Sequence, residues 1–143
     1  MTKVPSDRYI CEATFFVRYA ETDQMGIVHH SNYLVYCEEL RSQYARDMGS
    51  NYADFERLGL ALAVSEVNLR FLSPALYGQR ITIRGWVEEL KSRRITFGYQ
   101  IVNTDNGQVY VAGTTKHICV DREGKVARIP EDWVKMWEVR QTS

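Results

Sequence analysis

The chain has 143 residues, with 18 Lys or Arg against 18 Asp or Glu, so its formal net charge is zero. This balance excludes the strong field that draws a protein to nucleic acid or to an anionic membrane, and we expect neither as a partner. We expect one domain, residues 1–143, because a chain of this length can bury a core without disulfide or metal support.

The N-terminal part predicts a strand followed by a polar loop. The stretch "CEATFFVRYAET" is rich in aromatic and β-branched residues, which predicts a strand over residues 12–19. The loop "ETDQMGIVHHSNY" spans residues 21–33, and in it Ser31 or Asn32 is available to cap a helix.

A long helix is predicted next, over residues 32–48, because apolar side chains recur there at steps of three and four. Gly49 stands where a glycine commonly ends a helix. A second, short helical piece is predicted over residues 52–58. The side chains expected on the buried face of the long helix are Tyr33, Tyr36, Cys37, Leu40, Tyr44 and Met48.

After Gly59 the pattern is that of strands almost to the end of the chain. A strand and a Pro/Gly turn occupy "LALAVSEVNLRFLSPALYG", and two period-two stretches, "QRITIRGWVEELK" and "RRITFGYQIVN", follow it. The turn signal "TDNG" then precedes a returning strand, "QVYVAGTTKHICVD". "PEDWVKMWEVR" predicts a C-terminal helix with Pro130 near its first turn.

This order of elements predicts α+β architecture, with an antiparallel β-sheet wrapped around one long central helix. An open sheet of this kind ends in unpaired edges that invite pairing with a second copy, so we expect a homodimer. The N-terminus lacks the apolar run of a signal peptide, and polar residues interrupt every later stretch before it could span a membrane. We therefore expect a cytoplasmic protein with no membrane partner.

The sequence contains none of the usual motifs for nucleotide hydrolysis, Rossmann redox chemistry, serine hydrolysis or zinc proteolysis. The loop before the long helix is the first candidate site. Asp23 lies seven residues before His30, and Gly26 between them lets the chain double back. A carboxylate facing the unpaired N–H groups of a helix start can act on a carbonyl that those groups polarise, which suits acyl transfer.

Simpler interpretations stay open for each of these residues. Asp23 is of a type common in turns and caps, and the pair His29–His30 can be solvent-facing or helix-capping. A metal site needs three or four convergent ligands, and we expect none here. The three cysteines form no CxxC pair, which indicates reduced thiols, and Cys37 and Cys119 are expected in the core.

The second candidate site is the basic turn "KSRR", residues 91–94, between two predicted strands. Lys91, Arg93 and Arg94 could form a solvated hairpin turn. They could also hold phosphates of CoA or of a nucleotide, because Arg forks and Lys point charges suit phosphate groups.

The stretch "VRYAETDQMGIVHHSNYLVYCEELR", residues 17–41, resembles the signature of the 4-hydroxybenzoyl-CoA thioesterase-like family of hotdog-fold acyl-CoA thioesterases. That family has a Tyr four residues before an Asp, then a Gly, a His or Tyr, and a helix that begins near Asn-Tyr and carries an ExxR pair. The matching positions here are Tyr19, Asp23, Gly26, His30, Asn32, Tyr33, Glu38 and Arg41. "NLRFLSPALYGQRI" also resembles the family's turn between strands, and the likeness covers residues 14–121.

The resemblance implies a hotdog fold, homodimers that assemble into homotetramers, and active sites at the subunit interface. It implies hydrolysis of an acyl-CoA, with Asp23 as nucleophile or general base. The backbone N–H of His30 would polarise the thioester carbonyl, while the side chains of His30 and Tyr19 line the site. Gly26, His29 and Tyr33 would lie at the substrate, and the basic turn (Lys91, Arg93 and Arg94) would meet CoA phosphates.

Other activities of related proteins remain alternatives to this interpretation. A second hotdog branch places a catalytic Glu on the central helix, where Glu39 lies away from the apolar face. Hotdog dehydratases act on acyl chains carried by an acyl carrier protein, and a non-catalytic acyl-CoA-binding module would bind without turnover. The reaction of a thioesterase needs no metal or organic cofactor, because the thioester carbonyl is a good electrophile and the thiolate leaves readily.

Overall fold

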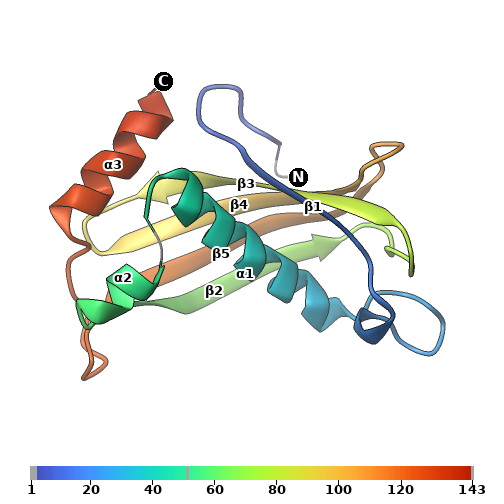
Figure 1. Ribbon diagram of the computed structural model, residues 1–143, viewed down its shortest axis with the longest axis horizontal. Coiled ribbons are helices and arrows are strands. Elements are labelled where there is room, and N and C mark those ends of the chain that lie inside the picture. The colour runs from blue at the N-terminus through green and yellow to red at the C-terminus, as the bar shows by residue number, and fades with distance from the viewer. Residues whose placement is uncertain (1–2, 51, 143) are drawn as a thin grey trace.

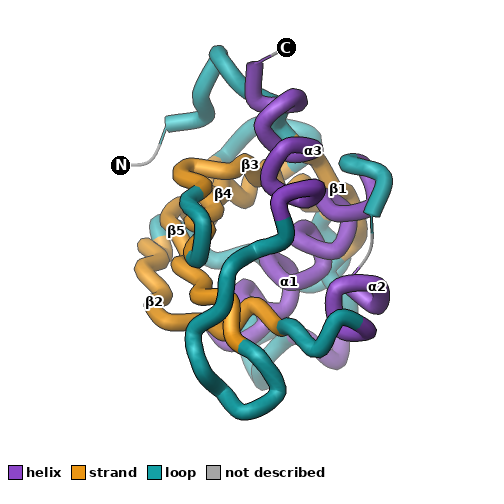
Figure 2. The backbone as a smooth tube through the Cα atoms, turned by 90° about the vertical axis from the view of Figure 1, so that its left-hand side faces the viewer, coloured by secondary structure: helices purple, strands orange, loops and turns teal. Residues whose placement is uncertain are grey.

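The structure is a computed structural model that describes residues 3–50 and 52–142. These residues form one β-sheet with helices packed on one face (Figure 1). The strands are β1 (Cys11–Phe16), β2 (Ala61–Phe71), β3 (Arg80–Leu90), β4 (Arg94–Asn103) and β5 (Val109–Val120). The helices are α1 (His30–Asp47), α2 (Tyr52–Arg57) and α3 (Glu131–Thr142), with a 3-10 turn at Tyr19–Glu21. Figure 2 shows strands and helices as two layers, which confirms the predicted α+β class.

The sheet is antiparallel throughout, with the strand order β1-β3-β4-β5-β2. The predicted "TDNG" turn joins β4 to β5, and Gly107 there has a φ of +76°, which glycine adopts without strain. Strands β1 and β2 form the two edges. β2 carries exposed apolar side chains at Val64, Val67 and Phe71, which are 43–54% exposed. This edge is therefore both unpaired and apolar in one chain.

Helix α1 lies across the concave face of the sheet and packs against β1 and β3. All six side chains predicted for its inner face are buried. Gly85 on β3 permits the close approach, because a Cβ at that position would lie 1.6 Å from Leu40 Cδ2. The predicted inner faces of β3 and β4 are buried as well, including Ile83 and Phe97.

Two predicted boundaries are wrong. The first strand ends at Phe16, not at residue 19, because the next residues wind into the 3-10 turn that brings the Glu21 side chain inward. Helix α1 begins at His30, not at residue 32, because His29 is its N-cap. The His29 Nδ1 atom accepts a hydrogen bond from Ser31 N at 3.2 Å, so neither Ser31 nor Asn32 has the predicted capping role.

The glycine predicted after the long helix and the proline predicted at the start of the C-terminal helix are confirmed. Gly49 follows α1 with a φ of +85°, and Pro130 immediately precedes α3.

Cys11, Cys37 and Cys119 are buried free thiols, and burial raises the pKa of Cys37 to about 12. No helix within residues 3–50 and 52–142 is long and apolar enough to cross a membrane.

Candidate active site

The loop between β1 and α1 is a tight hairpin. Thr22 pairs with Val28 in an antiparallel bridge, and Asp23 N donates to Ile27 O at 2.8 Å. Gly26 reverses the chain with a φ of +76°, which confirms the predicted doubling back. The hairpin thus returns the chain to the start of α1 directly after the carboxylate.

The hairpin is held against the connection between β2 and β3. Tyr77 N donates to Gly26 O and Val28 N donates to Ala75 O, each at 2.9 Å. Tyr33 supports this connection from below, since its hydroxyl accepts a hydrogen bond from Ala75 N at 3.1 Å. The Tyr33 side chain is buried, so within one chain it holds the loop in place. The predicted contact of Tyr33 with substrate stays a prediction.

The exposed carboxylate of Asp23 has a structural contact on one side only. Its Oδ1 atom accepts hydrogen bonds from Met25 N at 2.8 Å and from Ile27 N at 3.2 Å. Its Oδ2 atom has no hydrogen-bond partner among residues 3–50 and 52–142. One oxygen therefore shapes the turn while the other faces outward.

A second loop of the chain has the same geometry. Asp121 Oδ1 accepts from Glu123 N at 2.9 Å and from Lys125 N at 3.0 Å, and Gly124 has a φ of +81°. Both loops carry the pattern Asp-x-x-Gly. Holding the turn is therefore enough to explain an aspartate at either position. What distinguishes Asp23 is the helix start that follows it.

The start of α1 leaves one backbone donor open. The N–H groups of Ser31 and Asn32 donate to His29, whereas the N–H of His30 has no hydrogen-bond partner within the described ranges. An open N–H at the positive end of a helix suits a developing oxyanion. Of the two interpretations left open for the pair His29–His30, the structure shows helix-capping for His29. The role of the His30 N–H at a substrate stays a prediction.

Three exposed aromatic rings surround this end of the helix. The rings of His29 and His30 stack with their centroids 4.3 Å apart, and His30 also meets the edge of Phe71 on β2 at 6.4 Å. Tyr19 is 75% exposed, and its ring contacts Tyr77 at a centroid distance of 5.6 Å. The structure thus places Tyr19 and both histidines around the loop that carries Asp23.

Glu21 is a buried part of this loop that the sequence did not reveal. Its carboxylate accepts from Arg18 N at 2.8 Å, from the Arg18 guanidinium at 2.7 Å and from the Tyr36 hydroxyl at 2.9 Å. Its carbonyl accepts from His29 N and from the Asn32 side chain. Burial raises the pKa of Glu21, but the Arg18 and Tyr36 hydrogen bonds outweigh it, so the net pKa is lowered.

The basic turn lies at the opposite end of the sheet from this loop (Figure 1). The loop follows the end of β1, which pairs with the start of β3, whereas Lys91 and Arg93 follow the end of β3. β3 has 11 residues. At about 3.3 Å per residue it separates the two sites by roughly 35 Å. All three basic side chains are exposed, but a single chain does not bring them to Asp23.

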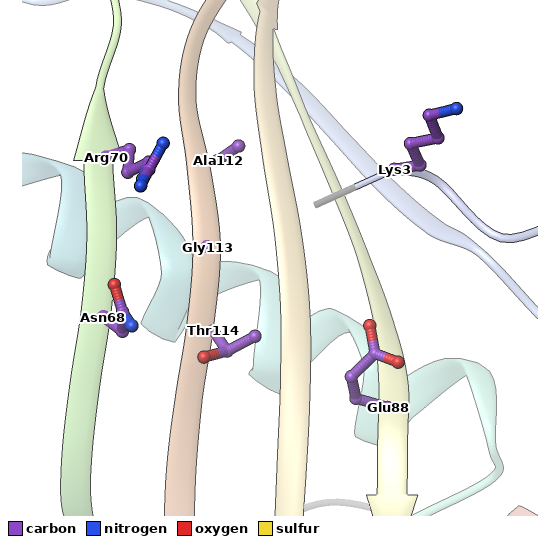
Figure 3. A pocket seen from close by; sticks show the side chains of 7 residues that line it. All are labelled: Lys3, Asn68, Arg70, Glu88, Ala112, Gly113 and Thr114. Atoms are coloured by element: carbon purple, nitrogen blue, oxygen red, sulfur yellow. The ribbon is translucent and has the colours of Figure 1, made fainter. Parts of the chain in front are cut away.

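Two hollows of similar size lie on opposite faces of the sheet. One, of about 420 Å³, is on the face turned away from α1 and is flanked by Asn68 and Arg70 of β2 and Thr114 of β5 (Figure 3). The other, of about 360 Å³, lies between α1, α2 and the start of β2, and is lined by Arg41 and His117 among others. In the described ranges no three His, Cys, Asp or Glu side chains form a group that could hold a metal ion.

Comparison with known proteins places the chain in a family. The Thioesterase-like superfamily matches residues 17–137. The Bacillus subtilis (strain 168) protein named "Putative acyl-CoA thioesterase YneP" is 41% identical over 107 residues, which are 75% of this chain and 77% of that protein.

Two solved structures share the fold. A hypothetical protein, TT1821 of Thermus thermophilus, superposes with a TM-score of 0.85 at 37% identity, covering 92% of this chain and 98% of that one. The DHNA-CoA thioesterase of Staphylococcus aureus superposes with a TM-score of 0.86 at 29% identity, covering 92% and 91%. The chain belongs to the Thioesterase-like superfamily, and with its sheet wrapped on one long helix it is a hotdog-fold thioester hydrolase.

Proposed function

We propose that the protein hydrolyses an acyl-CoA thioester to a free acid and CoA, with Asp23 as nucleophile or general base. The observation that carries this proposal is the exposed Asp23 carboxylate, with one oxygen unoccupied, on the loop that leads into the open N–H of His30. Two names support CoA esters as substrates. The Bacillus relative is named "Putative acyl-CoA thioesterase YneP", and the S. aureus structure is that of a DHNA-CoA thioesterase. Release of free thiol from a panel of acyl-CoA esters tests the reaction.

The chemistry requires few groups. In the general-base route, Asp23 takes a proton from a water molecule that adds to the thioester carbonyl, and the N–H of His30 stabilises the negative charge that forms on the carbonyl oxygen. The carbon–sulfur bond then breaks, the free acid forms, and the CoA thiolate takes up the proton. In the nucleophile route, the Asp23 carboxylate itself adds and displaces the CoA thiolate, and water then hydrolyses the resulting anhydride, which releases the acid and restores the carboxylate. The exposed rings of Tyr19, His29 and His30 border the entrance to this site.

We further propose that each active site is shared by two subunits paired through β2. Antiparallel pairing of two β2 edges sets the Phe71 end of one strand beside the Ala61 end of the other. Because His30 contacts Phe71, the pairing brings Asp23 of the partner subunit to the end of the sheet that carries this chain's basic turn. The exposed Val64, Val67 and Phe71 would be covered in such a dimer, which two copies can extend to a tetramer.

Substituting Val67→Asp tests this arrangement. Val67 lies near the middle of β2, so in an antiparallel pair it is close to its own copy, and two like charges there repel. We expect light scattering to show monomers, and thioester hydrolysis to fall by at least about tenfold. Val126→Asp is the matched control, because Val126 is also exposed but lies outside the strands. A Val67→Asp variant that is monomeric and fully active would contradict the shared site.

The basic turn is tested by the double substitution Arg93→Ala and Arg94→Ala. If these side chains hold CoA phosphates across the dimer, KM for acyl-CoA rises by about tenfold or more while kcat changes little. Thioesters without the nucleotide, including those of an acyl carrier protein, should be unaffected. Arg84→Ala removes a partly exposed arginine in the middle of β3 as a control. Equal effects on both kinds of thioester would rule out a phosphate contact.

A further inference from the structure

A buried chain of hydrogen bonds leads from α1 across the inner face of the sheet to the cavity of about 360 Å³. Arg41 Nη1 donates to Tyr99 Oη at 3.1 Å. Tyr99 Oη lies 2.6 Å from Thr115 Oγ1, which in turn lies 2.8 Å from His117 Nε2. Tyr99, Thr115 and His117 are all at most 1% exposed. Arg41 and His117 are the first and last residues of this hydrogen-bond network, and both line the cavity.

The direction of these hydrogen bonds follows from the groups involved. A guanidinium only donates, so the Tyr99 oxygen accepts from Arg41 and the single phenolic proton goes to Thr115. Thr115 then gives its hydroxyl proton to His117 Nε2. Any other direction would leave the buried hydroxyl proton of Tyr99 or of Thr115 without an acceptor in this network, which is costly. His117 is therefore a neutral imidazole that carries its proton on Nδ1.

The remaining nitrogen of His117 is directed to the cavity. Nδ1 makes no hydrogen bond within the described ranges. Among the described residues, Trp137 Nε1 is the side-chain nitrogen or oxygen that is both fully buried and without a partner. Since His117 Nδ1 also lacks a partner, it is not fully buried, and the cavity that His117 lines is the space it reaches. Burial, reinforced by the charge of Arg41, lowers the pKa of His117 to about 4, which keeps the ring neutral at pH 7. A neutral, oriented donor thus faces the empty space.

We propose that this cavity is a specificity pocket in which His117 Nδ1–H donates a hydrogen bond to an uncharged oxygen on the acyl group of the substrate. The inference rests on the proposed function, because the cavity opens at the Ala61 end of β2, where the partner subunit's Asp23 would lie. Glu38 and Glu56 also line it beside Arg41, which disfavours an anionic group and favours a hydroxyl or keto oxygen. Tyr99 and Arg41 act as positioning residues, since they fix which nitrogen of His117 holds the proton.

The test compares acyl-CoA esters of equal chain length that carry a hydroxyl, a keto oxygen or neither. The wild-type kcat/KM should favour one or both oxygenated esters by about 10- to 100-fold. His117→Phe keeps an aromatic ring but removes the donor, so the ratio should fall to about one while the unsubstituted ester is still hydrolysed. An unchanged ratio in His117→Phe would overturn the inference. If no ester of any kind is hydrolysed by the wild type, the proposed function itself fails.

A second measurement does not depend on that variant folding. Nitrogen-15 NMR of the imidazole rings should show His117 as the Nδ1–H tautomer at pH 7. Its signals should shift when the oxygenated product acid is added, and should stay in place with the unsubstituted acid. Tyr99→Phe interrupts the chain of hydrogen bonds and should allow the other tautomer to appear. An Nε2–H tautomer in the wild type, or the same response to both acids, would refute the pocket.

Discussion

Replacing Asp23 by Asn should reduce kcat for acyl-CoA hydrolysis by at least about 10²–10³-fold and leave the fold intact. The amide oxygen of Asn can accept the same hydrogen bonds from Met25 N and Ile27 N, so the hairpin keeps its shape. The substitution removes only the charge and the second carboxylate oxygen, which both a nucleophile and a general base require. Steady-state kinetics with thiol detection, together with the melting temperature, measure the two effects separately.

The second Asp-x-x-Gly loop provides an internal control for this experiment. Asp121→Asn changes a carboxylate with the same two backbone contacts and the same loss of charge, at the other end of β2 from this chain's own α1 start. It should leave kcat unchanged, because Asp121 is not followed by an open helix N-terminus. Asp23→Ala extends the comparison, because it removes the turn contacts as well and should lower the melting temperature in addition to the rate. Asp23→Asn with turnover equal to that of Asp121→Asn would contradict the catalytic role.

The sequence predicted those features of the fold that depend on local periodicity. The three- and four-residue spacing from Tyr33 to Met48 is present because one side of α1 must fit the sheet, and every residue in it is buried. Period two in β3 and β4 has the same cause. The loop from Asp23 to His30 was also visible, since a turn glycine and a helix start leave clear local signals.

The cap of α1 is a local feature for which the sequence left two interpretations open, Ser31 or Asn32 and the histidine pair. The structure has His29, although Ser and Asn are the commoner N-caps. Features that depend on contacts between distant residues left no such signal. Glu21 resembles any polar loop residue, and only the folded chain brings Tyr36 to it. The alternation in β5 does place Thr115 and His117 on one face, which was a usable sign of a buried polar chain. The separation of Asp23 from the basic turn required the strand order itself.

Substituting Glu21→Ala should lower the free energy of unfolding by about 2–4 kcal/mol. The change leaves the Tyr36 hydroxyl and the Arg18 N–H without their acceptor next to the core. It also frees the turn that sets the position of the hairpin, so the rate of thioester hydrolysis should fall at temperatures where the variant is still folded. Chemical denaturation gives the first quantity and kinetics the second.

Glu12→Ala is the appropriate comparison, because Glu12 pairs with Arg84 at 3.2 Å on the surface, where both side chains are well exposed. Its cost should stay below about 1 kcal/mol. If the two substitutions cost the same, the contacts of Glu21 do not stabilise the loop as inferred.

The pH dependence of stability separates the charge of Glu21 from its packing. Because the folded-state pKa of Glu21 is below its ordinary value of 4.5, the unfolded chain binds a proton there first as the pH falls. The contribution of Glu21 is therefore complete above that value and is lost as the pH drops through and below it. Glu21→Gln keeps the shape and can still accept from Tyr36, so it should be less stable than the wild type at pH 7 and should lose less stability on acidification. If the free energy of unfolding falls equally with pH in both proteins, the charge of Glu21 beside Arg18 does not contribute to stability, and the inference is wrong.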